Sequence, residues 1–263
     1  MAMDMATENM PPIGKIPDSM KTLFVLAGLA LSAAFAGEMD PLPRHYDFSH
    51  AKRQMDRIYY GDLRVTVYCG CRYESNRKPN GIDFAGCGFA PRKNADRASR
   101  IEWEHVVTAH NIGLSRKCWH KVPGRSARKN CEETDPEFAL MEGDLHNLLP
   151  SIGEVNGDRS NFMYSQWTNS PEPMYGACLS IVDFKAKKFQ PREEVRGMLA
   201  RISLYMEKTY GITLSKERRR LFEIWDRLFP VNAWECERDA RIFKVQGDHN
   251  PFVHERCREA GLV

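Results

Sequence analysis

The sequence predicts a mixed α+β fold that is rich in helices and forms a single domain. In the last third of the chain, apolar residues recur at the spacing of amphipathic helices. Earlier, the stretches 64–69 and 101–107 are alternating or apolar in the manner of β-strands. No repeat, low-complexity tract or long linker divides the chain, and a hydrophobic content of 42% suffices for one packed core.

The N-terminal segment is predicted to lie outside this domain. The stretch from Met20 to Ala36 has a basic start, an apolar middle of about a dozen residues and small residues at its end. This pattern is typical of a secretory signal peptide cleaved after Ala36, and an N-terminal anchor is the weaker alternative because the apolar run is short for a membrane span. Residues 1–19 fit no part of a signal peptide, which indicates a start at Met20 or a long leader. We therefore expect leader and signal over 1–36 and an exported domain over 37–263, periplasmic or secreted and without membrane attachment.

The cysteines support export. All eight follow the predicted cleavage point, and an even number in an exported chain indicates four disulfides. A four-cysteine zinc site has little support, because Cys69 and Cys71 form a CxC rather than a CxxC pair and no second close pair follows. Short spacing favours the loops Cys118–Cys131 and Cys236–Cys257, and the other pairings stay open.

Basic residues flank the stretch 101–107 on both sides. The formal net charge of the chain is +3, which is compatible with a polyanionic partner without requiring one. The flanking residues are Arg72, Arg77, Lys78, Arg92, Lys93, Arg97 and Arg100 before it, and Arg116, Lys117, Lys121, Arg125, Arg128 and Lys129 after it. Binding to a phosphate backbone would use such a distribution, although each residue alone fits a solvated loop equally well.

The elements of the first half are short. Helical spacing predicts a helix over 47–60, and alternation predicts a strand over 64–69. A segment rich in Gly, Asn and Arg predicts a disulfide-pinned loop up to residue 100. A strand is then expected over 101–107, and a basic, cystine-closed loop over 113–131.

The second half is predicted to be more regular. A helical turn over 136–142, an extended segment over 144–149 and a short helix over 152–161 with Ser151 as its N-cap precede a strand over 181–184. Three longer helices follow, because start and stop residues bracket their apolar stripes. The expected boundaries are Pro191 and Gly211, Ser215 and Pro230, and Ala233 and Gly247.

Two segments carry side chains suited to metal-assisted hydrolysis. Glu104 lies beside His105 in the first, and the second offers Asn156 and Asp158. Carboxylate and amide oxygens are hard ligands of the kind that Mg²⁺ prefers, and Mg²⁺ needs only one or two of them from the protein. A histidine with an ordinary pKa of about 6.5 is neutral often enough near pH 7 to take a proton from water. The hypothesis is therefore hydrolysis of a phosphodiester, with Glu104 and Asn156 on the metal and His105 as the base.

Strand geometry limits this interpretation. Adjacent residues of a regular strand point to opposite faces, so Glu104 and His105 share a site only if the strand ends or bulges there. For an isolated Glu-His dipeptide, a structural role for one of the pair is the favoured alternative. His146, in a Leu-His-Asn-Leu context, fits a core histidine as well as a functional one, and the zinc-protease signature HExxH is absent.

Several longer motifs resemble one known family. They are IEWEHVV (101–107), CW…GR…C (118–131), MEGDLHNLLPSIGEVNGDRSNF (141–162), SQW (165–167) and WECERDARIFKVQGDHNPFV (234–253). Over roughly residues 45–257, their order is similar to that of the bacterial endonuclease I family. Members of that family are periplasmic or secreted non-specific nucleases of the ββα-metal (His-Me finger) type.

The resemblance implies roles for individual residues. Glu104 and Asn156 would hold a single Mg²⁺ ion, with Ca²⁺ or Mn²⁺ as alternative ions, and His105 would be the general base. Arg125, in the Gly-Arg step of the cystine loop, would bind the scissile phosphate. Glu104 and His105 would then share a site at the irregular end of their strand, in one helix-rich domain built around a ββα-metal core. Eight cysteines in four disulfides also agree with the family pattern.

The implied activity is cleavage of DNA and often RNA, with little sequence preference and with 5′-phosphate products. Such an enzyme would contact the phosphate backbone of its nucleic acid and act as a monomer. The alternative from a different class is a catalytically silent, secreted nucleic-acid-binding protein.

Two departures from the family pattern keep residue alternatives open. Thr108 stands where the family usually has Pro, and the loop before Arg125 is one residue longer than usual. Arg128 is therefore the alternative phosphate ligand. Asn147 is the alternative metal ligand to Asn156, which we prefer because its helix should face the Glu-His strand.

Overall fold

The computed structural model describes residues 46–263 apart from 75–80 and 170. The predicted leader, signal peptide and cleavage point within 1–36 lie outside the described residues. In the part of the chain that is described, no helix is both long and apolar enough to cross a membrane.

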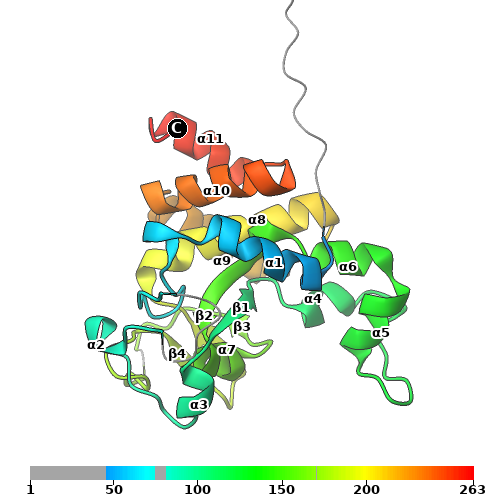
Figure 1. Cartoon of the computed structure of the whole chain (residues 1–263), viewed down its shortest axis with the longest axis horizontal. Coiled ribbons are helices and arrows are strands. Elements are labelled where there is room, and N and C mark those ends of the chain that lie inside the picture. Colours follow the sequence, from blue (N-terminus) through cyan, green and yellow to red (C-terminus); the bar gives the residue numbers. More distant parts are fainter. Residues whose placement is uncertain (1–45, 75–80, 170) are drawn as a thin grey trace, which may run out of the picture. The chain divides into compact units, whose positions relative to one another are not determined.

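Helices outnumber strands in the described domain, which confirms the predicted α+β class (Figure 1). The helices are α1 (Phe48–Ile58), α2 (Phe84–Cys87), α3 (Ala95–Ala98), α4 (Ala109–Gly113), α5 (Ala127–Thr134), α6 (Pro136–Glu142), α7 (Gly153–Arg159), α8 (Arg196–Tyr210), α9 (Lys216–Leu228), α10 (Ala233–Gln246) and α11 (Pro251–Glu259). The short 3₁₀ helices are η2 (Gly61–Leu63), η3 (Leu145–Asn147) and η4 (Glu193–Val195). The strands are β1 (Ile101–His105), β2 (Leu148–Ile152), β3 (Met163–Tyr164), β4 (Ile181–Asp183) and β5 (Lys188–Gln190).

A two-stranded antiparallel ribbon and one helix form the centre of the domain. Strand β1 pairs with β2 in a register that places Glu104 opposite Leu149 and His105 opposite Leu148. Helix α7 begins directly after β2 and packs against both strands. This β1–β2–α7 unit is the ββα core that the sequence predicts, and it sets Asn156 on α7 beside the strand that carries Glu104.

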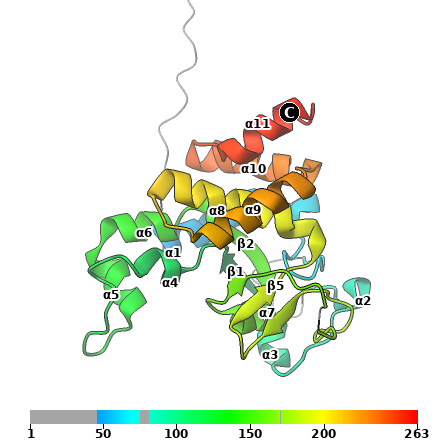
Figure 2. The same ribbon diagram turned by 180° about the vertical axis from the view of Figure 1, so that it is seen from behind.

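A second sheet, made of three short strands, lies beside this core and has the order β3-β5-β4 (Figure 2). Strand β3 runs parallel to β5, and β4 runs antiparallel to it. Phe189 in the middle strand is fully buried and packs its ring against that of Tyr68, with the ring centroids 4.5 Å apart. The second sheet thus supports the tyrosine that reaches into the candidate site described below.

The C-terminal helices form a layer on the other side of the β1–β2 ribbon, where α8 packs against α9 and α11, and α10 packs against α11 and α1 (Figure 1). Helix α8 is buried from Arg196 to Met206, so apolar side chains on more than one of its faces pack into the core. At Gly197, a Cβ would lie 2.0 Å from the carbonyl oxygen of Phe229, so only glycine permits this approach between α8 and the end of α9.

Local signals placed the long helices correctly. Gly211 and Gly247 both adopt the left-handed conformation that ends α8 and α10, and Ser215 caps α9 by accepting a hydrogen bond from the backbone N–H of Arg218. The sequence did not predict helices α2, α3, α4, α5 and α11. Helices α2 and α3 lie in the segment expected to be loop up to residue 100, and α5 occupies part of the expected 113–131 loop.

Two local predictions are wrong. The stretch 64–69 forms a turn with an isolated bridge rather than a strand, because Gly70 at φ +70° and the cystine at Cys71 reverse the chain there. Ser151 does not cap α7, because it is still paired within β2, and Ile152 takes the cap position without a side-chain hydrogen bond.

All eight cysteines form disulfides, as predicted. The two predicted pairs, Cys118–Cys131 and Cys236–Cys257, are confirmed. The pairings left open are Cys69–Cys178 and Cys71–Cys87. The first confirmed pair closes the segment that leads into α5, and the second joins α10 to α11.

A buried ionic cluster fixes the packing of α8 against the helices that follow it. The Arg201 guanidinium donates to both carboxylate oxygens of Glu235, at 2.8 and 2.5 Å, and to Asp226 at 3.1 Å. All three side chains are at least nine-tenths buried. Removing one partner from such a cluster strongly destabilises the fold, because a remaining charge stays buried without compensation.

We expect Arg201→Leu to lower the free energy of unfolding by about 3–5 kcal/mol, since it leaves buried Glu235 without its cation and Asp226 with Arg256 alone. Urea denaturation followed by circular dichroism measures this change. Arg219→Leu is the control, because Arg219 pairs with Glu207 while half exposed, and its loss should lower the free energy by less than about 1 kcal/mol. Equal effects of the two substitutions would contradict the role given to the buried cluster.

Candidate active site

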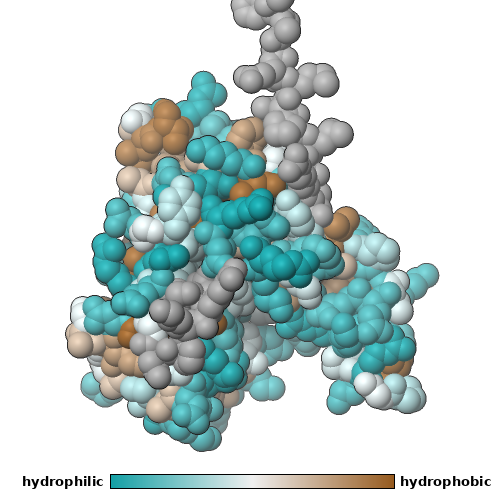
Figure 3. All heavy atoms as spheres, in the orientation of Figure 1, coloured by the Kyte–Doolittle hydropathy of each residue, from teal (hydrophilic) through white to brown (hydrophobic). Residues whose placement is uncertain are grey.

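A cavity of about 880 Å³ lies against β1 and is bounded by α1, α7 and the segment from Thr108 to α5. The surface is visibly hollowed between the part that carries α3 and α7 and the arm that carries α5 (Figure 3). Of the predicted site residues and their alternatives, Glu104, His105, Asn156 and Arg128 line this cavity. Arg125 and Asn147 are not among its lining residues.

Glu104 is held at the back of this cavity by two neighbours. Its Oε1 accepts a hydrogen bond from the Tyr68 hydroxyl at 2.6 Å and lies 2.8 Å from Nη1 of Arg159. Burial raises the pKa of Glu104, and the charge of Arg159 opposes that rise. Both contacts use Oε1, and no described residue hydrogen-bonds to Oε2, so one carboxylate oxygen is left for a cation.

Arg159 closes the end of the strand as well as pairing with Glu104. Its Nη1 donates to the carbonyl oxygen of His105 at 3.0 Å, and its Nη2 donates to that of Val106 at 2.7 Å. The sequence analysis did not single out Arg159. Its position three residues after Asn156 on one short helix, which puts both on one face, is the signal that could have found it.

His105 lies with its ring against that of Phe48, with the centroids 4.6 Å apart. Its Nε2 is 2.9 Å from the carbonyl oxygen of Glu142. Because a carbonyl oxygen only accepts, this contact assigns the proton to Nε2 and leaves the Nδ1 lone pair available. Burial and then the charge of Arg128 lower the pKa of His105 to about 3, so the imidazole is neutral near pH 7.

The strand does end at the Glu104–His105 step, which is what a shared site requires. His105 is the last residue of β1. Beyond it, the side chain of Asn147 hydrogen-bonds to the backbone of Val107 in place of a strand partner. Its Oδ1 accepts from the backbone N–H of Val107 at 2.8 Å, and its Nδ2 donates to the carbonyl oxygen of the same residue at 2.9 Å. Asn147 is fully buried with both amide atoms used in this way, so its position is that of a structural residue.

Asn156 presents its amide to the cavity from α7. Its Nδ2 donates to Oε2 of Glu102 at 2.8 Å, and Arg97 in turn holds Glu102 through two hydrogen bonds of 2.9 and 2.8 Å. With Nδ2 engaged, the amide has a fixed orientation and its Oδ1 is free to act as a hard oxygen ligand. Glu102 and Glu104 share a strand face at positions i and i+2, a spacing that the sequence analysis did not use. The other acid of the motif, Asp158, does not line the cavity and pairs with Arg92.

Arg128 is one of the cationic side chains that line the cavity. It lies on α5, pairs with Glu142 at 2.5 Å and Glu132 at 3.1 Å, and places its guanidinium 5.1 Å from the centre of the Phe48 ring. Its side chain is 40% exposed, so it can be reached from solvent. Arg125 lies in the turn that precedes α5 and forms an ion pair with Glu133.

Known proteins share the sequence that builds this site. The pattern of the Endonuclease I family matches residues 49–257. The chain belongs to the endonuclease I family. An extracellular deoxyribonuclease of Aeromonas hydrophila is 49% identical over 219 residues, which cover 82% of this chain and 93% of that protein.

Two further relatives give the same picture. A periplasmic deoxyribonuclease of Aeromonas hydrophila is 46% identical over 212 residues, covering 80% of this chain and 86% of that protein. Endonuclease-1 of Buchnera aphidicola subsp. Acyrthosiphon pisum is 49% identical over 192 residues, covering 73% and 74%.

Membership of the endonuclease I family confirms the resemblance predicted from the sequence. The chain is therefore a metal-dependent endonuclease that acts on nucleic acid. The names of the two Aeromonas relatives, extracellular and periplasmic, agree with the predicted export. The roles of Glu104, His105, Asn156 and Arg125 stay predictions.

The lowered pKa of His105 predicts how stability depends on pH. Its pKa is about 6.5 in the unfolded chain and about 3 in the folded one, so only the unfolded chain binds the proton between these values. The contribution of His105 to stability is therefore present above pH of about 6.5 and is lost as the pH falls toward 3.

Urea unfolding in chelator at several pH values tests this. Between pH of about 6 and 4, the wild type should lose up to about 1.4 kcal/mol per pH unit more than His105→Gln. Burial raises the pKa of Glu142 to about 7, which acts in the opposite sense, but Glu142 is present in both proteins and its effect is removed by the comparison. Parallel pH profiles for the two proteins would show that His105 is not buried in its neutral form.

Proposed function

We propose that this endonuclease is an exported, non-specific enzyme that hydrolyses phosphodiester bonds of DNA, and also of RNA, to leave 5′-phosphate ends. The observation that carries the proposal is the placing of Glu104, His105, Asn156 and Arg128 around one solvent-accessible cavity. Together they supply an oxygen donor set for a hard cation, a neutral base and a phosphate-binding cation. The relatives named deoxyribonucleases support DNA as a substrate.

We assign the metal to a single Mg²⁺ ion held by Glu104 and Asn156, with Ca²⁺ or Mn²⁺ as alternatives. The donor chemistry fits, because Oε2 of Glu104 and Oδ1 of Asn156 are hard oxygens with no hydrogen-bond partner among the described residues, and both side chains line the cavity. When bound, such an ion would neutralise the negative charge that gathers on the phosphate and the leaving oxygen. Two protein ligands suffice for Mg²⁺, since water and substrate complete its shell.

His105 would act as the general base. Its Nδ1 carries the free lone pair, and the hydrogen bond from Nε2 to the Glu142 carbonyl fixes the ring orientation. The Phe48 ring, tilted by 51° to the imidazole, packs against one side of it. The proton removed from the attacking water would thus pass to Nδ1, and the same hydrogen bond would stabilise the imidazolium formed.

Arg128 is better placed than Arg125 to contact the scissile phosphate. It lines the cavity that contains Glu104 and His105, and its guanidinium can donate two parallel hydrogen bonds to phosphate oxygens. Arg125 could still contact the nucleic acid backbone further along. Because these contacts are to phosphates, binding should depend weakly on sequence and strongly on salt.

We further propose that the enzyme is exported to the periplasm or the medium and acts there as a monomer. Four disulfides are typical of a protein that works in an oxidising compartment.

A supercoiled-plasmid assay tests the function directly. The mature enzyme should nick the plasmid in Mg²⁺ and stop in EDTA, and the same preparation should degrade RNA. Products should be substrates for a ligase, which requires 5′-phosphate ends. If the protein bound the plasmid but did not nick it in Mg²⁺, Mn²⁺ or Ca²⁺, the result would favour the catalytically silent binding protein instead.

We expect His105→Ala to lower the nicking rate by about 100–10,000-fold, the usual contribution of a general base, while DNA binding is preserved. Glu104→Gln should also lose activity, and calorimetry should show weaker Mg²⁺ binding to it but not to His105→Ala. A Glu104 variant that binds Mg²⁺ as tightly as the wild type would remove Glu104 from the metal site.

Substitution of the two arginines distinguishes their roles. Arg128→Ala should reduce kcat/KM by about 100-fold or more if its charge stabilises the transition state, and Arg128→Lys should restore only part of it because lysine cannot donate in parallel. Arg125→Ala is the matched control and should have the smaller effect. The reverse order would return the phosphate role to Arg125.

A further inference from the structure

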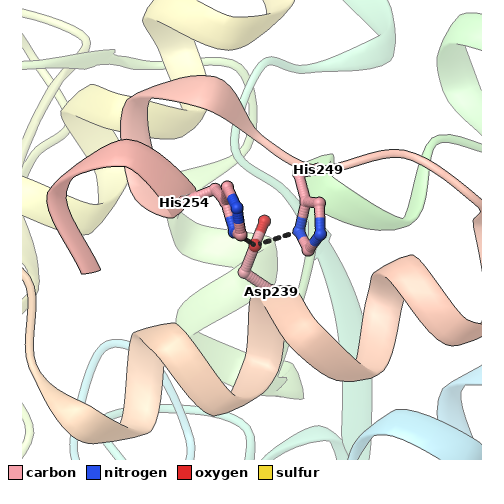
Figure 4. Close-up of side chains that lie close together, drawn as sticks. All are labelled: Asp239, His249 and His254. Atoms are coloured by element: carbon pink, nitrogen blue, oxygen red, sulfur yellow. Dashed lines mark hydrogen bonds and ion pairs between the residues drawn. The ribbon is translucent and has the colours of Figure 1, made fainter. Parts of the chain in front are cut away.

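Three side chains outside the candidate active-site cavity converge near the C-terminus (Figure 4). Asp239 comes from α10, His249 from the loop after it, and His254 from α11. Nδ1 of His249 is 2.6 Å from Oδ2 of Asp239, and Nδ1 of His254 is 3.8 Å from the same oxygen. One potential ligand atom from each residue lies within 4.8 Å of the other two.

The framework around these side chains is rigid. The disulfide Cys236–Cys257 joins the two helices that carry Asp239 and His254. Oδ1 of Asp239 accepts from the backbone N–H of Asn250 at 2.9 Å, and the Phe243 ring stacks on His249 with the centroids 4.2 Å apart. The donor atoms are therefore held near their positions before any ligand arrives.

The charge of Asp239 is not balanced by a permanent cation. Its side chain is only 3% exposed, yet in the described part of the chain only histidines lie within ion-pair distance of it. A third imidazole, that of buried His146, approaches Oδ1 to 3.9 Å, and its Nδ1 has no hydrogen-bond partner. A buried carboxylate is unfavourable unless a positive charge or a metal compensates it.

The two partly exposed imidazoles are poorly arranged to compensate Asp239 by both becoming protonated. The rings of His249 and His254 stack with centroids 3.9 Å apart, so protonating both would bring two like charges face to face. Neutral imidazole is also the form that binds metals.

We propose that Asp239, His249 and His254 bind a borderline transition-metal dication, of which Zn²⁺ is the representative, at a site separate from the nuclease centre. Imidazole ligands favour Zn²⁺, Ni²⁺ or Cu²⁺ over Mg²⁺ and Ca²⁺. In a tetrahedral site with bonds of about 2.1 Å, donor atoms lie about 3.4 Å apart, and the separations of 2.6 and 3.8 Å bracket that value. His249 and His254 are 27% and 33% exposed, so an ion can enter and water can fill the remaining position.

Such an ion would connect α10, its following loop and α11 in addition to the disulfide. It would supply the missing positive charge at Asp239 and stabilise the folded state by mass action, since the unfolded chain does not hold the three ligands together. It would have no direct part in phosphodiester cleavage, because none of its ligands lines the cavity that contains Glu104 and His105.

Zinc titration of the chelator-treated mature protein tests the proposal. Calorimetry in excess Mg²⁺ should count one more Zn²⁺ ion in the wild type than in the double variant His249→Gln/His254→Gln. Each single variant should weaken that binding event at least tenfold, and the rise of Tm on adding Zn²⁺ should shrink accordingly. Asp239 is left intact, since its Oδ1 also holds the start of α11.

His50→Gln provides the matched control. His50 and Asp47 form an exposed histidine–aspartate pair at 2.7 Å, which resembles the His249–Asp239 contact but has no second imidazole in ion-pair contact among the described residues. Its substitution should leave the zinc stoichiometry unchanged. Nicking in Mg²⁺ alone should be the same for the double variant and the wild type.

A measurement on the wild type avoids dependence on the folding of the variants. Addition of Co²⁺ should produce large paramagnetic shifts in the imidazole NMR signals of His249 and His254. Absence of those shifts, or a zinc stoichiometry that the double variant does not lower, would overturn the proposal without affecting the nuclease assignment.

Discussion

The buried contact between Arg159 and Glu104 is the interaction on which the candidate active site depends. Arg159 reaches from α7 to the last residues of β1, where it binds two backbone carbonyl oxygens as well as the carboxylate. It therefore fixes the place where the strand ends, which allows Glu104 and His105 to line one cavity. Buried ion pairs often add little net stability, so positional control is the better explanation for keeping this one.

Burial acts on the two neighbouring residues in opposite chemical senses that suit their proposed roles. It raises the pKa of Glu104, because a buried carboxylate is unfavourable unless a cation compensates its charge. It lowers the pKa of His105, which keeps the imidazole neutral. Tyr68 and Arg159 occupy only Oε1 of Glu104, and the Glu142 carbonyl occupies only Nε2 of His105. Each of these two cavity-lining residues thus retains one reactive atom without a hydrogen-bond partner among the described residues.

The sequence predicted what depends on local chemistry and missed what depends on long-range contacts. Ser215, Gly211 and Gly247 were correct helix boundaries because caps and left-handed turns are local. The two short-spaced disulfides were found, whereas Cys69–Cys178 spans 109 residues and leaves no local signal. The preference for Asn156 over Asn147 stays a prediction, and it rests on the position of α7 beside the strand. The proposal of Arg128 in place of Arg125 rests on the start of α5, which forms in a segment expected to be loop.

Glu142 joins the proposed base to the proposed phosphate ligand. Its backbone carbonyl orients His105, and its carboxylate pairs with Arg128, whose charge helps to lower the pKa of that histidine. When Arg128 turns toward a bound phosphate, the negative charge of the substrate would offset its effect on the imidazole. The basicity of His105 would then rise on substrate binding, at the step where a base is needed. This arrangement follows from the last turn of α6, which supplies both the carbonyl and the carboxylate from one residue.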